Sequence, residues 1–356
     1  MINAGQKMGR SSVRTMSSRR GFPPLRPLAH GLIAALSLSS FAAAACAAPV
    51  PAAGRSPDAL RRMAVTIDDL PFAPPGRHTT EQQVEITERL LAVLAAHEAP
   101  AIGFVNESKL EVDGVVDPRR VALLERWLEA GHELGNHGYA HLDLHRVDLE
   151  TWLADVLRGE RVTRPLVAAR ERKLEWFRHP FLHSGRSVEV QRRTARVLAE
   201  HGYRIAPVTV DNGEWIYANA YADAWNRGDQ ATMERLGRDY VRYMLEVVEF
   251  YEGQSRAIVG ELIPQSLLIH AYALNADWLD PLLGALEERG YRWITLTEAV
   301  EHPAYDRPTE GHTGPGGITW LHRWAITAGM DPTIFRGEPE VPQWVEELRA
   351  TTGTAH

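Results

Sequence analysis

Residues 63–69 read MAVTIDD, a compact apolar run that ends in two adjacent aspartates. The apolar part, 63–67, has the length of a buried strand. A segment with leucines at helical spacing follows at 81–96, and a second strand-like run follows at 101–105. Strand, helix and strand in this order favour parallel strands with helices outside them.

The same alternation continues to about residue 300. It predicts helices at 118–130, 149–163, 188–201 and 280–289, and strands at 174–178, 204–210, 266–270 and 291–295. A run of this kind indicates an α/β fold, either doubly wound or closed into a barrel. We therefore expect one α/β domain over residues 61–302.

Two segments interrupt the alternation. Residues 216–256 form a predicted helical insertion rich in aromatic residues, which could serve as a lid, as a substrate wall or as ordinary core packing. Residues 303–356 contain three tryptophans among glycines and prolines and are interpreted as an extension packed on the domain.

The first 48 residues have the order of an export signal. A basic lead precedes an apolar run at 28–45, and small residues surround Cys46. Residues 18–22 resemble a twin-arginine motif, whereas a lipoprotein signal is less favoured because Ala43 stands where leucine is usual. The apolar run is too short for a stable membrane span. We expect a periplasmic or extracellular protein with a linker at 49–60.

Composition excludes several classes of protein. The 356 residues are 44% hydrophobic and 24% charged, which is ordinary for a folded soluble chain. The formal charge of −7 opposes a polyanion, so we expect no nucleic acid partner. The single cysteine excludes intramolecular disulfides and cysteine-rich zinc folds.

Polar residues follow most of the predicted strands at the end where ligands gather in α/β folds. These residues are Asp68 and Asp69, the segments 135–141 (GNHGYAH), 178–181 (RHPF) and 211–215 (DNGEW), and His270.

His137 and His141 are four residues apart, a spacing that places two imidazoles on one side of a helical turn. An aspartate from 68–69 would complete three protein ligands and leave a fourth position for water. The alternative interpretations are a surface histidine pair and an aspartate cap on the next segment. The sequence has no G-x-S-x-G, P-loop or G-x-G-x-x-G motif, so hydrolysis by metal-activated water remains.

These five pieces, in this order, resemble the five motifs of the polysaccharide deacetylases, carbohydrate esterase family 4, with the NodB-homology fold. The resemblance runs from about residue 63 to residue 300 and implies a distorted (β/α) barrel of about seven strands. It implies removal of N-acetyl, or O-acetyl, groups from a glycan.

The resemblance also implies roles for individual residues. One divalent metal ion, expected to be Zn²⁺, is held by Asp69, His137 and His141. Asp68 is the base that deprotonates the attacking water, and His270 protonates the leaving amine. The supporting residues are Arg178 beside Asp68, Glu214 with Asp211 near His270, a backbone N–H near Phe181 for the oxyanion, and Trp215 with Leu268 around the acetyl methyl.

Three positions depart from the family pattern. Leu70 replaces a glycine, Gly138 replaces a serine or threonine that braces the histidine loop, and Glu214 replaces an aspartate. None of these changes removes a proposed catalytic or metal-binding group. Two alternative functions stay open, a catalytically weak carbohydrate-binding protein and a hydrolase of a non-sugar amide C–N bond.

Overall fold

The computed structural model describes residues 61–73 and 78–351. The predicted export signal and the whole predicted linker, residues 49–60, lie outside the described residues. Among the residues that are described, no helix combines the length and apolarity needed to cross a membrane.

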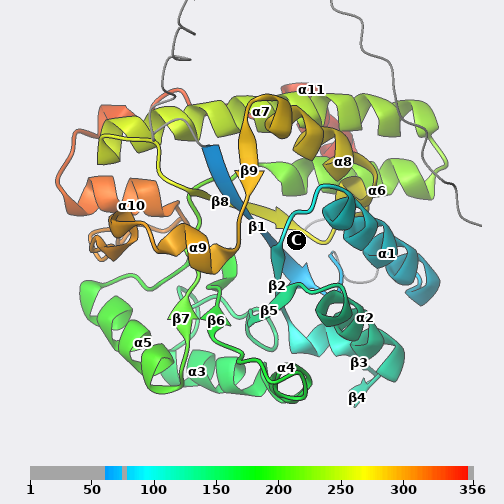
Figure 1. Ribbon diagram of the computed structural model, residues 1–356, viewed down its shortest axis with the longest axis horizontal. Coiled ribbons are helices and arrows are strands. Elements are labelled where there is room, and N and C mark those ends of the chain that lie inside the picture. Colours follow the sequence, from blue (N-terminus) through cyan, green and yellow to red (C-terminus); the bar gives the residue numbers. More distant parts are fainter. Residues whose placement is uncertain (1–60, 74–77, 352–356) are drawn as a thin grey trace, which may run out of the picture. The chain divides into compact units, whose positions relative to one another are not determined.

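The centre of the fold is a curled parallel sheet of seven strands (Figure 1). Its main order is β7-β6-β5-β2-β1-β8, and β9 pairs with the first residues of β1. The strands are β1 Arg61–Leu70, β2 Ala101–Val105, β5 Glu133–Asn136, β6 Trp176–Phe177, β7 Arg204–Ile205, β8 Gln265–His270 and β9 Tyr291–Trp293. A separate hairpin is formed by β3 Glu111–Val112 and β4 Val115–Val116.

The segment after β7 closes the sheet into a distorted barrel. Ala206 N–H donates to the Phe177 carbonyl on one side, and Val210 forms a parallel bridge with Leu267 of β8 on the other. The predicted strand at 204–210 therefore has regular ladder pairing only at its start, yet it spans the gap between the two sheet edges. The expected seven-stranded distorted (β/α) barrel is confirmed.

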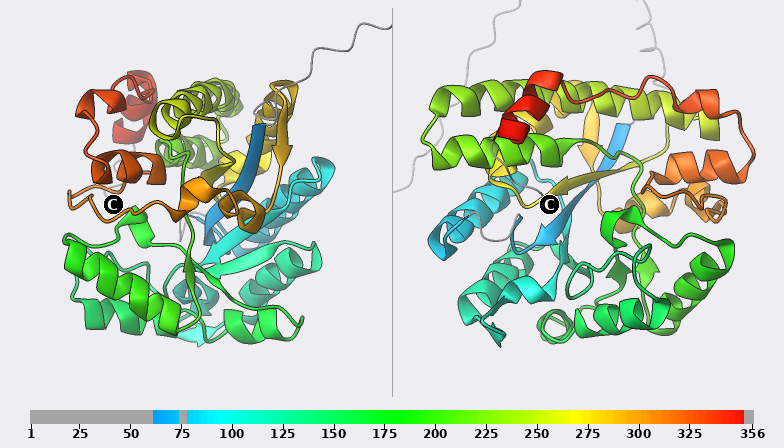
Figure 2. Two further views of the ribbon diagram at one scale, coloured as in Figure 1. Left: turned by 60° about the vertical axis from the view of Figure 1, so that its left-hand side comes forward. Right: turned by 180° about the vertical axis from the view of Figure 1, so that it is seen from behind.

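Helices surround the barrel (Figures 1 and 2). Those before the insertion are α1 Thr80–Ala96, α2 Pro118–Glu129, α3 Leu149–Arg158, α4 Thr163–Ala168 and α5 Val188–Glu200. Those that follow are α6 Glu214–Asn226, α7 Gln230–Val259, α8 Ala273–Glu288, α9 Leu296–Val300, α10 Trp320–Thr327 and α11 Gln343–Thr351.

Two helix predictions are wrong in their extent. The helix predicted at 149–163 is divided, because Gly159 ends α3 and its backbone packs against Gly138, where a Cβ would lie 2.5 Å from the Gly138 carbonyl carbon. The helix predicted at 280–289 begins seven residues earlier, at Ala273, with Pro281 inside it. Proline lacks an amide hydrogen and therefore resembles a helix start in sequence.

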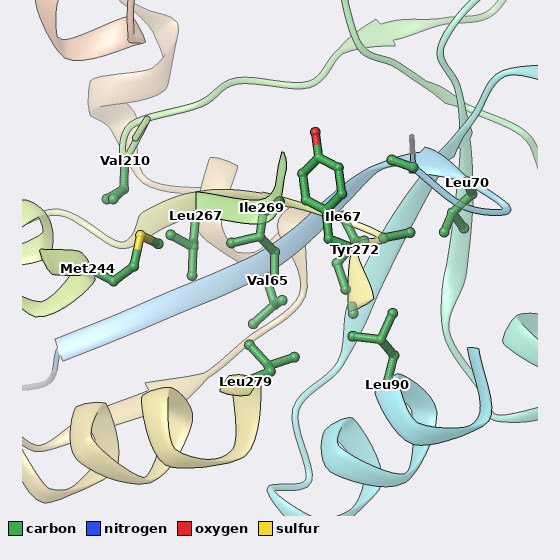
Figure 3. Close-up of a cluster of buried hydrophobic side chains, with 14 of the residues drawn as sticks. Val65, Ile67, Leu70, Leu90, Val210, Met244, Leu267, Ile269, Tyr272 and Leu279 are labelled. Carbon is green, nitrogen blue, oxygen red and sulfur yellow. The ribbon is translucent and has the colours of Figure 1, made fainter. Parts of the chain in front are cut away.

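The core lies between β1, β8 and their covering helices. Figure 3 shows Val65 of β1 and Ile269 of β8 near Leu279 of α8, with Leu90 of α1 beside them. All four side chains are buried.

Helices α6 and α7 occupy the segment predicted as a helical insertion, and they lie side by side (Figures 1 and 2). Five tyrosines of this pair are buried, which favours the interpretation of its aromatic residues as core packing: Tyr217, Tyr221, Tyr240, Tyr243 and Tyr251.

Two glycines of α7 offer a matched test of this packing. A Cβ on Gly237 would lie 1.8 Å from the Trp278 indole, whereas a Cβ on Gly253 would meet nothing within 4 Å. Gly237→Ala is expected to lower the free energy of unfolding by about 1–3 kcal/mol because the indole must move. Gly253→Ala is expected to raise it by about 0.5–1 kcal/mol. Urea unfolding measures both, and equal effects would contradict the assigned packing.

Candidate functional site

The site begins at an irregularity near the end of β1. Asp68 pairs in register with His270 of β8, and the register with β2 shifts between Ile67 and Leu70. Asp69 lies in this bulge with φ of 72°, a left-handed conformation that is uncommon for a residue other than glycine. A bulge re-aims side chains. The two adjacent carboxylates consequently contact different groups, although both belong to the site.

Asp68 is buried between two basic side chains. Its Oδ2 lies 3.7 Å from Arg178 Nη1 and 3.7 Å from His137 Nε2. Its Oδ1 is buried with no hydrogen-bond partner in the described part of the chain. Burial raises the pKa of Asp68 to about 6, since it outweighs the opposing charge of Arg178. Arg178 therefore limits the rise in pKa without cancelling it.

Asp69 has the opposite electrostatic environment. Its Oδ1 lies 3.0 Å from Lys109 Nζ and 3.9 Å from His141 Nε2. Burial works against ionisation, but the positive charges of Lys109 and His270 outweigh it and hold the pKa of Asp69 well below its usual range. Asp69 is therefore a carboxylate throughout the neutral range.

His137 and His141 come together through a loop, so the helical turn expected from their spacing is wrong. His137 follows β5 directly, and His141 has φ of 57°, which no α-helix accommodates. Their ring centroids nevertheless lie 4.7 Å apart. The distance between the two rings is set by the loop that joins them.

Hydrogen bonding leaves one nitrogen of His137 facing the aspartates. Its Nδ1 lies 2.8 Å from the Arg178 carbonyl, which can only accept, so Nδ1 carries the hydrogen. Nε2 then keeps its lone pair. Burial lowers the pKa values of both His137 and His141, which keeps the rings neutral and able to bind a metal ion.

The loop between these histidines is held by residues to which the sequence analysis assigned no role. Asp155 accepts hydrogen bonds from the backbone N–H groups of Tyr139 and Ala140, and the Asn136 side chain accepts one from Gly138 N–H. Gly138 itself has φ of 78°. These bonds brace the loop where the family pattern has a serine or threonine.

The three predicted metal ligands lie close enough to share one ion. One ligand atom each from Asp69, His137 and His141 lies within 4.8 Å of the other two. One carboxylate and two neutral imidazoles suit Zn²⁺ and related divalent metals. The residues present therefore fit the metal that the sequence predicts.

His270 lies at the end of β8 and pairs with Glu214 at the start of α6. His270 Nδ1 is 2.7 Å from Glu214 Oε2, and Asn275 donates a hydrogen bond to the other carboxylate oxygen. Burial alone would lower the pKa of His270, but the hydrogen bond and charge of Glu214 outweigh it and raise that pKa to about 9. Nδ1 then donates to Glu214, and His270 is protonated at neutral pH.

The remaining predicted site residues lie around this group. Asp211 precedes α6, and burial raises its pKa to about 6, with Arg178 and His270 opposing the rise. Phe181 is 54% exposed and its ring lies 4.5 Å from that of His141. Leu268 belongs to a small apolar cluster with Leu182 and Val208. Trp215 follows Glu214 on α6 and is half-buried against the main core.

Sequence reasoning missed Lys109 and Asp155. Lys109 lies in the 3₁₀ turn Glu107–Leu110 directly after β2, so the strand-end rule that found the aspartates would also have found it. Asp155 lies inside α3 and acts on a loop distant in sequence. No local pattern marks such a contact.

A second group of possible metal ligands lies nearby, formed by Asp143, His145 and His183. The two imidazoles are stacked 3.9 Å apart with planes only 6° from parallel, so their in-plane lone pairs cannot converge on one ion. Both His145 nitrogens already face backbone groups, the Pro315 carbonyl and Gly185 N–H, at 3.2 Å each. This group is therefore a hydrogen-bond network.

The fold and the site together define a class of protein. It is a parallel β/α barrel that carries carboxylates and imidazoles at the carboxyl ends of its strands. The family model described as polysaccharide deacetylase matches residues 56–206, so this segment of the chain is similar to that family. The resemblance inferred from the five motifs is confirmed. No curated protein sequence matches the chain.

Several solved structures match the chain, and three of them come from Bacillus species. Peptidoglycan deacetylase PdaC from Bacillus subtilis is 18% identical, with 68% of this chain and 92% of that chain covered and a TM-score of 0.42. A polysaccharide deacetylase from Bacillus cereus is 16% identical, with 66% and 91% covered and a TM-score of 0.44. A pseudoenzyme of carbohydrate esterase family 4 from Bacillus anthracis is 16% identical, with 68% and 66% covered and a TM-score of 0.41.

Replacement of Glu214 tests the electrostatic assignment of His270. In metal-free Glu214→Gln the pKa of His270 should fall well below about 9, because burial is then opposed only by the weaker charges of Asp69 and Asp68. Nuclear magnetic resonance titration of the imidazole measures it. Glu340→Gln, at an exposed carboxylate, is the control and should leave the value unchanged. An unshifted His270 in Glu214→Gln would refute the pairing.

Proposed function

We propose that this protein is a metal-dependent deacetylase that removes N-acetyl, or O-acetyl, groups from a cell-envelope or extracellular polysaccharide or oligosaccharide. The observation that carries the proposal is the grouping of the Asp69, His137 and His141 ligand atoms. Two further groups accompany them, Asp68, which is ionised at neutral pH, and His270, which is protonated at neutral pH. The match of residues 56–206 to the polysaccharide deacetylase family model supports an acetylated glycan as substrate.

Asp69, His137 and His141 would hold one divalent metal ion per chain, with Zn²⁺ as the expected ion. Such an ion would act as a Lewis acid, which polarises the acetyl carbonyl and makes water more acidic. The chain itself contributes the carboxylate charge of Asp69 and the neutral state of the two imidazoles.

Asp68 is the proposed general base. Its pKa of about 6 leaves it ionised at neutral pH but basic enough to take a proton from the attacking water. Its Oδ1, which has no partner in the described part of the chain, is the oxygen available to accept that proton. The guanidinium of Arg178 offsets part of the cost of burying this charge.

His270 is the proposed general acid. An amide nitrogen is a poor leaving group until it is protonated, and His270 holds a proton at neutral pH because of Glu214. Asn275 donates to Glu214 and to the His270 carbonyl, which fixes the orientation of this pair.

The segment after Arg178 is proposed to bind the oxyanion and the acetyl group. Phe181 N–H donates no backbone hydrogen bond within residues 61–73 and 78–351, so it is available to a developing negative charge. Leu268, which packs with Leu182, would contact the acetyl methyl, together with Trp215.

The proposed organisation of the chain follows from these roles. We assign the chemistry to the barrel at 61–302, with residues 303–356 as an extension. Residues 1–48 would be removed on export, which N-terminal sequencing of the secreted form tests. A mature form that keeps residue 1 would contradict export by a cleaved signal.

Acetate release tests the function. Purified protein is incubated with acetylated chitooligosaccharides, peptidoglycan or acetylated xylan, with added Zn²⁺ and separately with a chelator. We expect chelator-sensitive release from at least one glycan. No release from any glycan by protein that binds one metal per chain would favour a non-sugar amide substrate. No release and no bound metal would favour a carbohydrate-binding protein.

The rate of acetate release should depend on both proposed proton-transfer groups. It should rise with pH as Asp68 loses its proton and fall as His270 loses its own, with both midpoints below the metal-free pKa values of about 6 and about 9 because a bound cation disfavours a proton on either group. His270→Ala should lower turnover by about 10²–10⁴-fold and remove the alkaline limb while metal binding persists. Steady-state rates against pH measure this, and unchanged turnover would exclude His270 as the acid.

A further inference from the structure

The loop that carries the proposed oxyanion donor is conformationally unusual. Phe181 and Leu182, neighbours in the 3₁₀ turn Pro180–Leu182, have φ of 57° and 55°. Two consecutive residues with side chains in the left-handed region are unfavourable and persist only where the surroundings impose them. Contacts from outside the loop must therefore impose these two conformations.

Arg323 of α10 makes the principal contacts to this loop. Its guanidinium donates to the Leu182 carbonyl at 2.6 Å and to the Ser184 hydroxyl oxygen at 2.7 Å, and its Nε donates to the Ile318 carbonyl at 3.3 Å. The residue is only 2% exposed.

The guanidinium of Arg323 forms no ion pair with a carboxylate among residues 61–73 and 78–351. Burial lowers its pKa to about 10, so it stays charged at neutral pH. A buried charge without a counter-ion is costly unless its donors are satisfied. Its donors go to oxygens of the loop and of the extension, so the charge stabilises this one arrangement of the loop.

The backbone of the extension also packs directly on the loop. A Cβ on Gly317 would lie 2.0 Å from the Phe181 carbonyl oxygen, which leaves no room for any other residue there. Trp320 N–H donates to the Val208 carbonyl at 2.7 Å, which attaches the start of α10 to the segment that closes the barrel.

The far end of the loop is held by the network of Asp143, His145 and His183. His183 pairs with Asp143 at 2.7 Å, and Gly185 N–H donates to His145. The loop is thus held at both ends, and Arg323 acts at the end next to Phe181.

We propose that Arg323 is a positioning residue for the deacetylation, since it holds the 181–184 loop so that Phe181 N–H points at the developing oxyanion. This inference rests on the proposed function and gives the C-terminal extension a part in the site. Arg323 itself does not contact the reacting atoms. Its removal should therefore change the rate of the chemical step more than substrate binding.

The test compares Arg323→Met, Arg323→Lys and a control, Arg336→Met, an exposed arginine of the same extension. Turnover is measured on the panel glycan that gives chelator-sensitive acetate release, per folded chain with equal bound metal. Hydrogen exchange of the 180–185 amides is measured on the same samples.

For Arg323→Met we expect kcat to fall about 10–100-fold with KM within about twofold, because one oxyanion donor is misplaced. Exchange at 180–185 should accelerate about tenfold or more while exchange in β1 is unchanged. Arg323→Lys keeps the charge but has fewer hydrogen-bond donors, so its kcat and its exchange rates should lie between those of Arg323→Met and the wild type. Arg336→Met should match the wild type in both measurements. A wild-type kcat per folded chain in Arg323→Met would overturn the proposal.

The test also has an answer if the Arg323 variants do not fold or if the wild type is inactive. If neither Arg323 variant folds, Ser184→Ala and Gly317→Ala disturb the same contacts, and normal kcat in both would overturn the proposal. If the wild type releases no acetate from any glycan, the proposed function fails and the role in deacetylation fails with it. Hydrogen exchange then still decides whether Arg323 holds the loop.

Discussion

The site depends on one constraint, the placement of two adjacent carboxylates, one buried and one half-buried, in the bulge near the end of β1. Two neighbouring negative charges repel one another in a medium of low dielectric constant, so each requires its own compensation. Arg178 faces Asp68 and Lys109 faces Asp69, and the resulting pKa values diverge. Asp68 acquires the properties of a base and Asp69 those of a permanently charged ligand. Chemically identical side chains are thereby fitted to different roles.

Arg178 connects this constraint to the rest of the site. Its guanidinium lies against Asp68, donates to the Thr66 hydroxyl and lies over the Phe104 ring at 4.6 Å. Its carbonyl accepts from His137 Nδ1. One buried residue thus limits the pKa of the proposed base and sets the tautomer of a proposed ligand. It also begins the loop that the C-terminal extension holds in place.

The alternation of strands and helices was sufficient to predict an α/β fold, and the resemblance to the polysaccharide deacetylases specified a barrel. The grouping of the polar residues was predictable because parallel strands present their carboxyl ends at one edge. Asp68, Asp69, His137, His141, Glu214 and His270 lie together for that reason. The bulge at Asp69 and the loop at His141 were not predictable, since both are left-handed conformations of residues that carry side chains. The role of Arg323 was not predictable, because its hydrogen-bond partners Leu182 and Ser184 lie about 140 residues earlier in the chain.

The most direct test of the account is the metal affinity of Asp68→Asn beside that of Asp69→Asn, measured by calorimetry with Zn²⁺ and combined with acetate release. The account predicts that Asp68→Asn keeps an affinity within about tenfold of the wild type, as for a residue beside a metal site, and loses turnover. It predicts that Asp69→Asn loses both. Equal loss of affinity in the two variants, or turnover that survives in Asp68→Asn, would contradict the division of roles between the two aspartates.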